Sequence, residues 1–156
     1  MFRFFQFLFG SVALALAAVA GLLVFGTRAA PPEMTAITGP YRSADYSGLP
    51  ALQSLPAWRG GPIAYRRYGT GTGQATILLH GSAGYGMSLH PLARTLAEAG
   101  VSVFVPDIRG HGATGDRGTI SFPSQLDDDI QSLVDHIREQ LPKAQVTLAG
   151  VSAGGG

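Results

Sequence analysis

The sequence contains no cysteine, which excludes disulfide bonds, thiolate metal ligands and a cysteine nucleophile. Charged residues are also scarce, at 13% of 156 residues, and they nearly cancel to a net charge of +1. The eleven Lys and Arg residues are scattered, apart from the pair Arg66 and Arg67, so no basic face predicts binding to nucleic acid. The composition, 46% hydrophobic, is typical of one globular domain.

The N-terminal part of the chain is a long uncharged segment. No charged residue occurs from Phe4 to Thr27, and a helix of this length can cross a hydrocarbon core about 30 Å thick. Because Arg3 precedes the segment, we expect a membrane anchor in residues 1–28, with the following domain on the non-cytoplasmic side. The alternative is a signal peptide cleaved near Ala30, which would give a secreted or periplasmic protein.

Residues 29–57 are rich in proline and show no persistent apolar period. We therefore interpret this range as a linker, although the same composition also fits an irregular first strand region. The remaining residues, 58–156, are expected to form the globular domain.

Short apolar runs alternate with helix-like patterns in that domain, which predicts βαβ units and a mostly parallel sheet. A helix capped by Ser88 is expected to end at Gly100, and a second helix to run from Pro123 to Gln140. The predicted strands cover residues 63–68, 75–79, 101–105 and 145–149.

Three consecutive aspartates, Asp127, Asp128 and Asp129, fall near the start of the second predicted helix. Carboxylates there favour the positive end of the helix dipole, so we interpret them as a solvated helix start. A paired-carboxylate site is the alternative.

The pattern Gly150-x-Ser152-x-Gly154 directly follows the last predicted strand. This spacing is typical of a nucleophile elbow, a sharp turn from strand to helix that exposes a serine hydroxyl above the sheet. Glycines two residues before and after the serine allow close backbone approach where a Cβ would clash. Ser152 is therefore the candidate nucleophile, and an ordinary structural turn is the alternative.

Acyl transfer also requires hydrogen-bond donors for the negative charge that develops on the carbonyl oxygen. The backbone N–H of Ala153, next to the candidate nucleophile, is one candidate donor. The second is the backbone N–H of Ser82, in a glycine-containing loop after the strand predicted at residues 75–79. A flexible connection is the alternative interpretation of that loop.

Three motifs in this order resemble the α/β-hydrolase superfamily: residues 80–84 (HGSAG), residues 107–112 (DIRGHG) and residues 150–154 (GVSAG). The resemblance covers about residues 63–156 and is strongest to the branch of S33 serine aminopeptidases, lysophospholipases and monoacylglycerol lipases. It implies an α/β-hydrolase fold, of which this chain carries the N-terminal part. It also implies that Ser152 is the nucleophile and that Ser82 and Ala153 form the oxyanion hole.

The resemblance further implies that the triad acid and histidine follow the nucleophile in the chain. None of the four histidines has the position of the base in this family, so we expect these 156 residues to be inactive alone. Those histidines are His80, His90, His111 and His136.

We expect the substrate to be an acyl ester, with an apolar acyl chain favoured by the membrane segment. Thioesters and amides are the alternative substrates. An amide substrate would correspond to a serine aminopeptidase. A binding protein that keeps the fold without catalysis is the rival hypothesis. No metal or nucleotide cofactor is expected, because the glycines at Gly69 to Gly73 lack the lysine of a phosphate-binding loop.

Overall fold

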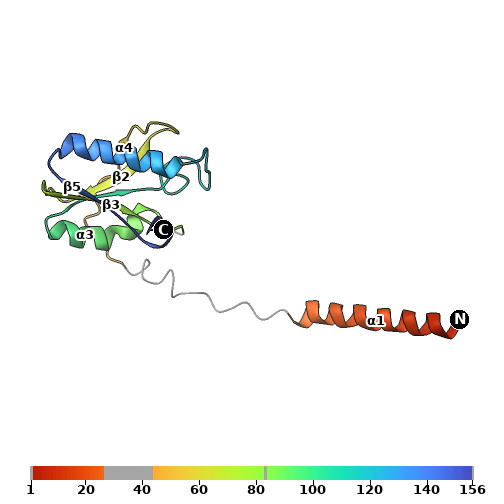
Figure 1. Ribbon diagram of the computed structural model, residues 1–156. Coiled ribbons are helices and arrows are strands. Elements are labelled where there is room, and N and C mark those ends of the chain that lie inside the picture. Colours follow the sequence, from red (N-terminus) through yellow and green to blue (C-terminus); the bar gives the residue numbers. More distant parts are fainter. Residues whose placement is uncertain (1, 27–43, 83, 156) are drawn as a thin grey trace. The chain divides into compact units, whose positions relative to one another are not determined.

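The computed structural model describes residues 2–26, 44–82 and 84–155 (Figure 1). The chain divides into two compact units, residues 1–42 and residues 43–156. The second unit contains the whole sheet and all three predicted motifs.

In the first unit, helix α1 spans Phe2–Phe25. Among the described residues, no helix is both long and apolar enough to be a membrane span. The prediction of a linker over residues 29–57 is tested only in part, since residues 29–43 lie outside the described residues.

Strand β1, Gln53–Leu55, lies within the range predicted as linker. It pairs antiparallel with β2, Ile63–Tyr68, and Leu55 is buried in the core. The end of this range is therefore part of the domain, as in the alternative of a first strand region. The apolar Leu55 side chain gains from burial, and a three-residue strand is too short to show a period in the sequence.

The five strands form one sheet in the order β1-β2-β4-β3-β5. Strand β3 runs parallel to both β4 and β5, whereas β2 runs antiparallel to β1 and β4. The sheet is therefore mixed, and the prediction of a mostly parallel sheet was wrong for its first two strands. A short loop joins β1 to β2, and such a loop can only reverse the chain, because a parallel pair needs a long crossover. The remaining strands are β3 Gln74–Leu79, β4 Ser102–Pro106 and β5 Gln145–Gly150.

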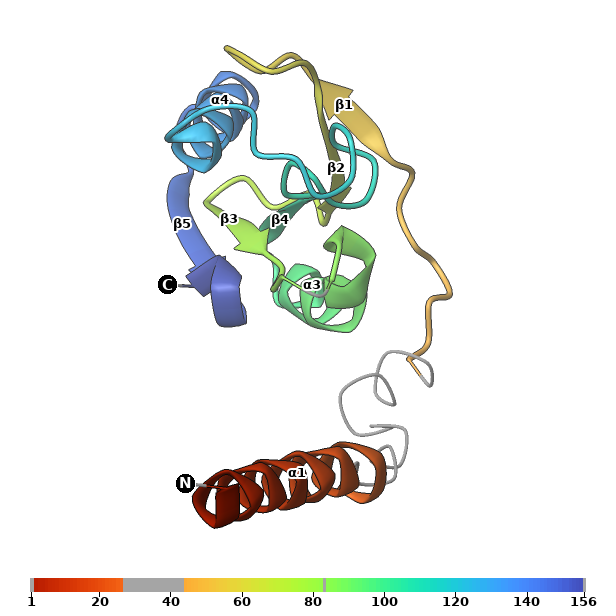
Figure 2. The ribbon, with the colours of Figure 1, turned by 90° about the vertical axis from the view of Figure 1, so that its right-hand side faces the viewer.

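Two helices cover opposite faces of the sheet, α3 (His90–Glu98) and α4 (Gln125–Gln140) (Figures 1 and 2). Alternate side chains of each strand point to opposite faces, so two apolar layers form. Leu133 and Ile137 of α4 pack in the layer that contains Phe104, while Ala93 of α3 packs in the layer that contains Val103.

The start of α3 differs from the prediction because Ser88 does not cap it. Ser88 lies in a separate 3-10 helix, η1 Gly86–Leu89, and its hydroxyl donates to the carbonyl oxygen of Tyr85 at 2.7 Å. Helix α3 then begins at His90, with Pro91 in its first turn, where a missing N–H has no cost.

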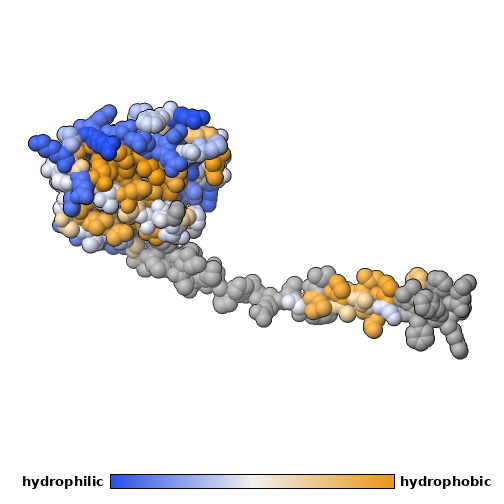
Figure 3. All heavy atoms as spheres, in the orientation of Figure 1, coloured by the Kyte–Doolittle hydropathy of each residue, from blue (hydrophilic) through white to orange (hydrophobic). Residues whose placement is uncertain are grey.

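Strand β5 lies at one edge of the sheet and pairs only with β3 in the described part of the chain. Its Leu148 side chain is 53% exposed. Figure 3 shows apolar surface in this part of the domain, between α3 and α4. The position of β5 matters for the site, because the serine motif follows directly.

Candidate active site

The three sequence motifs meet at one edge of the sheet. Strands β3, β4 and β5 are parallel, so their carboxyl ends lie together, and the register aligns Leu79 of β3 with Gly150 of β5. His80 follows β3, Asp107 follows β4 and Ser152 comes shortly after β5. Ligands of open α/β sheets bind at this edge, so the predicted site residues lie where the fold places chemistry.

Ser152 begins a short 3-10 helix, η2 Ser152–Gly155, immediately after β5. Its φ is 55°, and among the described residues only one other non-glycine residue, Ser124, has a positive φ. L residues rarely adopt this conformation, which persists where the surrounding structure imposes it. The Ser152 residue is exposed. The turn therefore has the strained backbone and accessible side chain that a nucleophile elbow requires.

Close packing of backbone against backbone explains the two glycines of the motif. The Val151 N–H donates to the carbonyl oxygen of Leu79 at 3.0 Å, which fastens the turn to the end of β3. A Cβ at Gly154 would lie 2.6 Å from the carbonyl oxygen of His80, and one at Gly150 would overlap the carbonyl oxygen of Gly154. No side chain fits at either glycine, as the motif spacing predicts.

Gly81 brings the loop of the candidate donor Ser82 next to the candidate nucleophile. A Cβ at Gly81 would lie 3.2 Å from the Cβ of Ser152 and 3.7 Å from its Oγ. Ser82 is the next residue in the chain, and Ala153 follows Ser152 in η2. The structure therefore brings together the loop of Ser82 and the turn of Ser152 and Ala153.

His80 fastens the loop after β3 to the loop after β4. Its Nδ1 donates to the carbonyl oxygen of Gly81 at 2.8 Å, and its Nε2 accepts the N–H of Ile108 at 2.9 Å. The imidazole is buried, and this burial lowers the pKa of His80. A neutral ring with both nitrogens occupied is a structural connection, not a general base.

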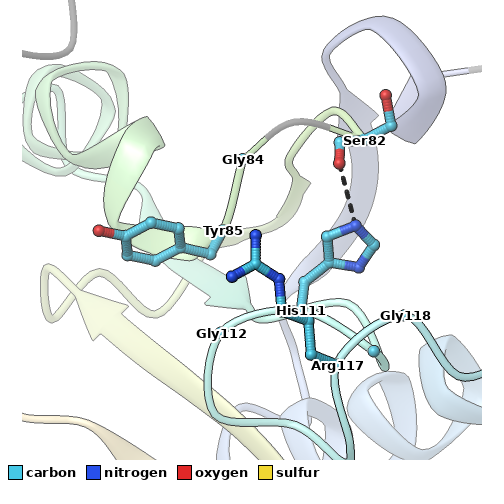
Figure 4. A pocket seen from close by; sticks show the side chains of 8 residues that line it. Ser82, Gly84, Tyr85, His111, Gly112, Arg117 and Gly118 are labelled. Carbon is cyan, nitrogen blue, oxygen red and sulfur yellow. Dashed lines mark hydrogen bonds between the residues drawn. The ribbon is translucent and has the colours of Figure 1, made fainter.

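His111 holds the same loop at Ser82 (Figure 4). Its Nε2 donates to the carbonyl oxygen of Ser82 at 3.0 Å, and its ring packs edge-on against His80 with 5.2 Å between centroids. Both histidines thus hold the loop that carries the candidate oxyanion donor.

Asp107 organises the loop after β4 through two backbone N–H groups. One carboxylate oxygen accepts from Gly86 at 2.7 Å and the other from Ala113 at 2.8 Å. Gly112, with a φ of 54°, lies so close that a Cβ there would overlap the carboxylate. The glycine after His111 is therefore required by the Asp107 carboxylate.

Arg109 joins the same loop to α4 through a buried ion pair. Its guanidinium donates to both carboxylate oxygens of Asp129, at 2.7 and 3.0 Å, and also to the carbonyl oxygens of Gly60 and Gly61. The side chains of Arg109 and Asp129 are 3% and 6% exposed. The prediction of a solvated aspartate run was therefore wrong for Asp129, because α4 turns it toward Arg109.

The two remaining histidines lie on helices away from the strand ends. His90 is buried in α3, with Nε2 donating to the carbonyl oxygen of Ser47 at 3.1 Å. His136 on α4 lies 2.8 Å from the Tyr65 hydroxyl, and burial lowers its pKa. Their contacts are structural.

A pocket of about 420 Å³ opens beside the loop that carries Ser82. Tyr85 and Arg117 line it together with His111, and sequence reasoning singled out neither Tyr85 nor Arg117. Both lie in glycine-rich loops where a side chain's direction has no sequence signal. Among the described residues, no group of His, Asp and Glu is arranged to hold a metal ion.

One family model matches more than half of the chain. It is described as serine aminopeptidase, S33, and it covers residues 72–156. No curated protein matches the chain.

Solved structures with the same fold include hydrolases of several kinds. DcsB, solved in complex with its substrate analogue, is 29% identical over 65% of this chain and 37% of its own, with a TM-score of 0.54. The epoxide hydrolase VrEH1 of Vigna radiata is 26% identical over 67% of this chain and 32% of its own, with a TM-score of 0.54.

A thioesterase domain from the curacin biosynthetic pathway is 27% identical over 67% of this chain and 38% of its own, with a TM-score of 0.50. The chain thus spans between 32% and 38% of the length of these three structures.

The buried ion pair gives a first prediction. Asp129→Asn leaves the Arg109 charge buried without its partner, which typically costs about 3–5 kcal/mol of unfolding free energy. Asp128→Asn is the matched control, because Asp128 lies 3.9 Å from an exposed Arg59 and its loss should cost less than about 1 kcal/mol. Urea unfolding measures both variants. Equal losses in the two variants would contradict a structural role for the pair.

Acidification gives a second prediction, through His80. Burial lowers the pKa of His80 from its ordinary 6.5, so below that pH the unfolded chain binds a proton more readily than the folded one. The contribution of neutral His80 to the unfolding free energy is complete above the pKa of this histidine in the unfolded chain. It is lost as the pH falls through the pKa in the folded chain. The unfolding free energy should therefore decrease as the pH falls below the ordinary histidine pKa of 6.5.

The variant His80→Gln cannot take up a proton and should flatten this decrease. His136→Gln should flatten the decrease as well, because burial also lowers the pKa of His136. The two variants together separate the contributions of the two histidines. An unchanged pH dependence in His80→Gln would show that this group does not carry the effect.

Proposed function

The chain belongs to the S33 serine aminopeptidase branch of the α/β-hydrolase superfamily, and on this premise we propose that it carries the nucleophile of a serine hydrolase acting on acyl esters. The observation that carries the proposal is the turn at Ser152. The residue is exposed, has a φ of 55° and lies beside Gly81. An exposed hydroxyl on a strained turn favours a role in nucleophilic attack over a role in packing of the protein interior.

In the proposed reaction, the Ser152 Oγ attacks the carbonyl carbon of the ester while its proton passes to a histidine base. The negative charge on the carbonyl oxygen accepts hydrogen bonds from the N–H groups of Ser82 and Ala153. Collapse of this intermediate releases the alcohol, which takes the proton from the histidine, and leaves an acyl-enzyme. Water then attacks the acyl-enzyme by the same steps and frees the acid.

The histidine and its acid follow the nucleophile along the chain in this fold. We infer that residues after Gly156 supply them. His80 is excluded as the base because its two nitrogens already bond to Gly81 and Ile108.

The other side chains of the site serve positioning in this proposal. His111 holds the Ser82 carbonyl, and Asp107 and Arg109 fix the loop that carries His111. These contacts keep the oxyanion loop against the serine before substrate binds, which is the preorganisation that lowers the barrier.

An amide substrate is the second candidate, because the matching family is described as serine aminopeptidase. The same attack by Ser152 and the same oxyanion contacts would serve an ester bond and an amide bond. The two reactions differ only in the leaving group, which is an alcohol or an amine. Parallel assays with an acyl ester and an aminoacyl amide distinguish them.

Covalent labelling tests the proposed nucleophile. The full-length protein should react with a fluorophosphonate probe at Ser152, and Ser152→Ala should abolish labelling and lower ester turnover by about 10⁴- to 10⁶-fold. Ser54→Ala is the matched control, because this exposed serine lies on β1 at the opposite edge of the sheet and should leave both unchanged. A well-folded protein that the probe does not label would instead support the rival hypothesis of a binding protein.

We also propose that residues 4–27 anchor the protein in a membrane, with the hydrolase domain on the non-cytoplasmic side. The proposal is supported by the absence of charge over this range and by Arg3 before it. Mass spectrometry of the mature protein should find the original N-terminus in the membrane fraction. A mature chain that starts at Ala30 or Pro31 would contradict an anchor and support a cleaved signal peptide.

A further inference from the structure

The pocket beside the oxyanion loop has one permanently charged side chain in its lining, that of Arg117. Figure 4 shows the guanidinium directed into the space between Tyr85 and His111. No hydrogen bond or ion pair joins Arg117 to another residue in the described part of the chain. The pocket therefore presents a guanidinium whose donors are available to a ligand.

Among the described residues, neither Asp107 nor Asp116 forms an ion pair with Arg117. Both carboxylate oxygens of Asp107 accept hydrogen bonds from backbone N–H groups, those of Gly86 and Ala113. Asp116 precedes Arg117 in the chain but does not line the pocket. Arg117 is therefore the one permanently charged side chain among the pocket residues that the structure describes.

The backbone around Arg117 is fixed by hydrogen bonds. The Thr119 N–H donates to the carbonyl oxygen of Asp116 at 3.2 Å, which closes a turn with Arg117 and Gly118 at its centre. Gly118 has a φ of 76°, as the third residue of a type II turn requires, and its N–H donates to the carbonyl oxygen of Gly110 at 2.8 Å. The turn is thus tied to the loop after β4, so the Arg117 side chain starts from a set position.

The pocket and the candidate nucleophile share one loop. Ser82 lines the pocket, and Gly81 before it is in contact range of Ser152. The pocket lining therefore begins one residue along the chain from the backbone that approaches Ser152.

We propose that Arg117 binds an anionic group of the substrate, a carboxylate or a phosphate, close to the ester that Ser152 attacks. This inference rests on the proposed function and adds the substrate class. A guanidinium matches both anions with paired N–H donors, which a lysine does not. Arg117 is a specificity-determining residue, while the chemistry stays with Ser152.

Kinetics with matched esters test the proposal in the full-length protein. One pair is the 4-nitrophenyl ester of succinate and its neutral methyl ester, and the other pair is 1-acylglycerol 3-phosphate and the neutral monoacylglycerol. Arg117→Gln should lower kcat/KM for at least one anionic member by about 10- to 100-fold and leave its neutral partner within about threefold. The pair that responds identifies a soluble carboxylate or a lipid phosphate.

Arg138→Gln is the matched control, because Arg138 is an exposed arginine in the last turn of α4 and does not line the pocket. Arg138→Gln should leave the ratio of kcat/KM for the anionic ester to kcat/KM for the neutral ester unchanged in both pairs. Arg117→Lys keeps the charge without the planar fork and should fall between the original protein and Arg117→Gln. Equal losses for the charged and neutral esters in Arg117→Gln would overturn the proposal.

A binding measurement separates this inference from the proposed function. In an NMR titration of the Ser152→Ala protein with inorganic phosphate, the amide signals of Gly112 and Gly118 should shift with saturation, and Arg117→Gln should abolish the shifts. Phosphate shifts that persist in Arg117→Gln, or no shifts in either protein, would overturn the anion site. If the original protein is not labelled by the fluorophosphonate but the phosphate shifts are seen, only the proposal of Ser152 as nucleophile is contradicted.

Discussion

The site depends on one close approach of backbone to backbone, where the turn after β5 packs against the end of β3. The Val151 N–H donates to the Leu79 carbonyl oxygen at 3.0 Å, and Gly154 lies where any side chain would meet the His80 carbonyl oxygen. This contact leaves Ser152 with a positive φ and places its Oγ beside Gly81. The strain is maintained because the parallel pairing of β3 with β5 and the hydrogen bond from Val151 to Leu79 hold the start of the turn against the end of β3.

Around this contact, the loops are held by buried polar groups whose partners are within the protein. Asp107 accepts two backbone N–H groups, Arg109 pairs with Asp129 on α4, and His80 bridges the loops after β3 and β4. Buried polar groups are costly unless they are hydrogen-bonded, so these contacts favour the observed arrangement of the loops. The same network fixes the Ser82 carbonyl through His111, whereas Arg117 in the pocket lining makes no hydrogen bond or ion pair with another residue that the structure describes.

Local patterns in the sequence predict much of this structure. Strand β2 spans the predicted residues 63–68, and the other predicted strands and helices agree within a few residues, because their apolar periods are strong. The mixed sheet was not predicted, since the direction of β2 depends on a hairpin with a three-residue partner. Asp129 was interpreted as solvated because its partner Arg109 is 20 residues away and no period links them. The direction of Arg117 depends on a turn that is tied to Gly110 of the loop after β4, and it has no sequence signal.

The proposed reaction requires the Ser152 Oγ to lie beside two backbone N–H groups that donate hydrogen bonds to the oxygen on which negative charge develops. A crystal structure of the full-length protein with a phosphonate bound covalently to the Ser152 Oγ tests this requirement most directly. We expect a phosphonyl oxygen about 2.7–3.1 Å from the backbone nitrogens of both Ser82 and Ala153. An adduct whose phosphonyl oxygen faces solvent, or contacts neither nitrogen, would contradict it.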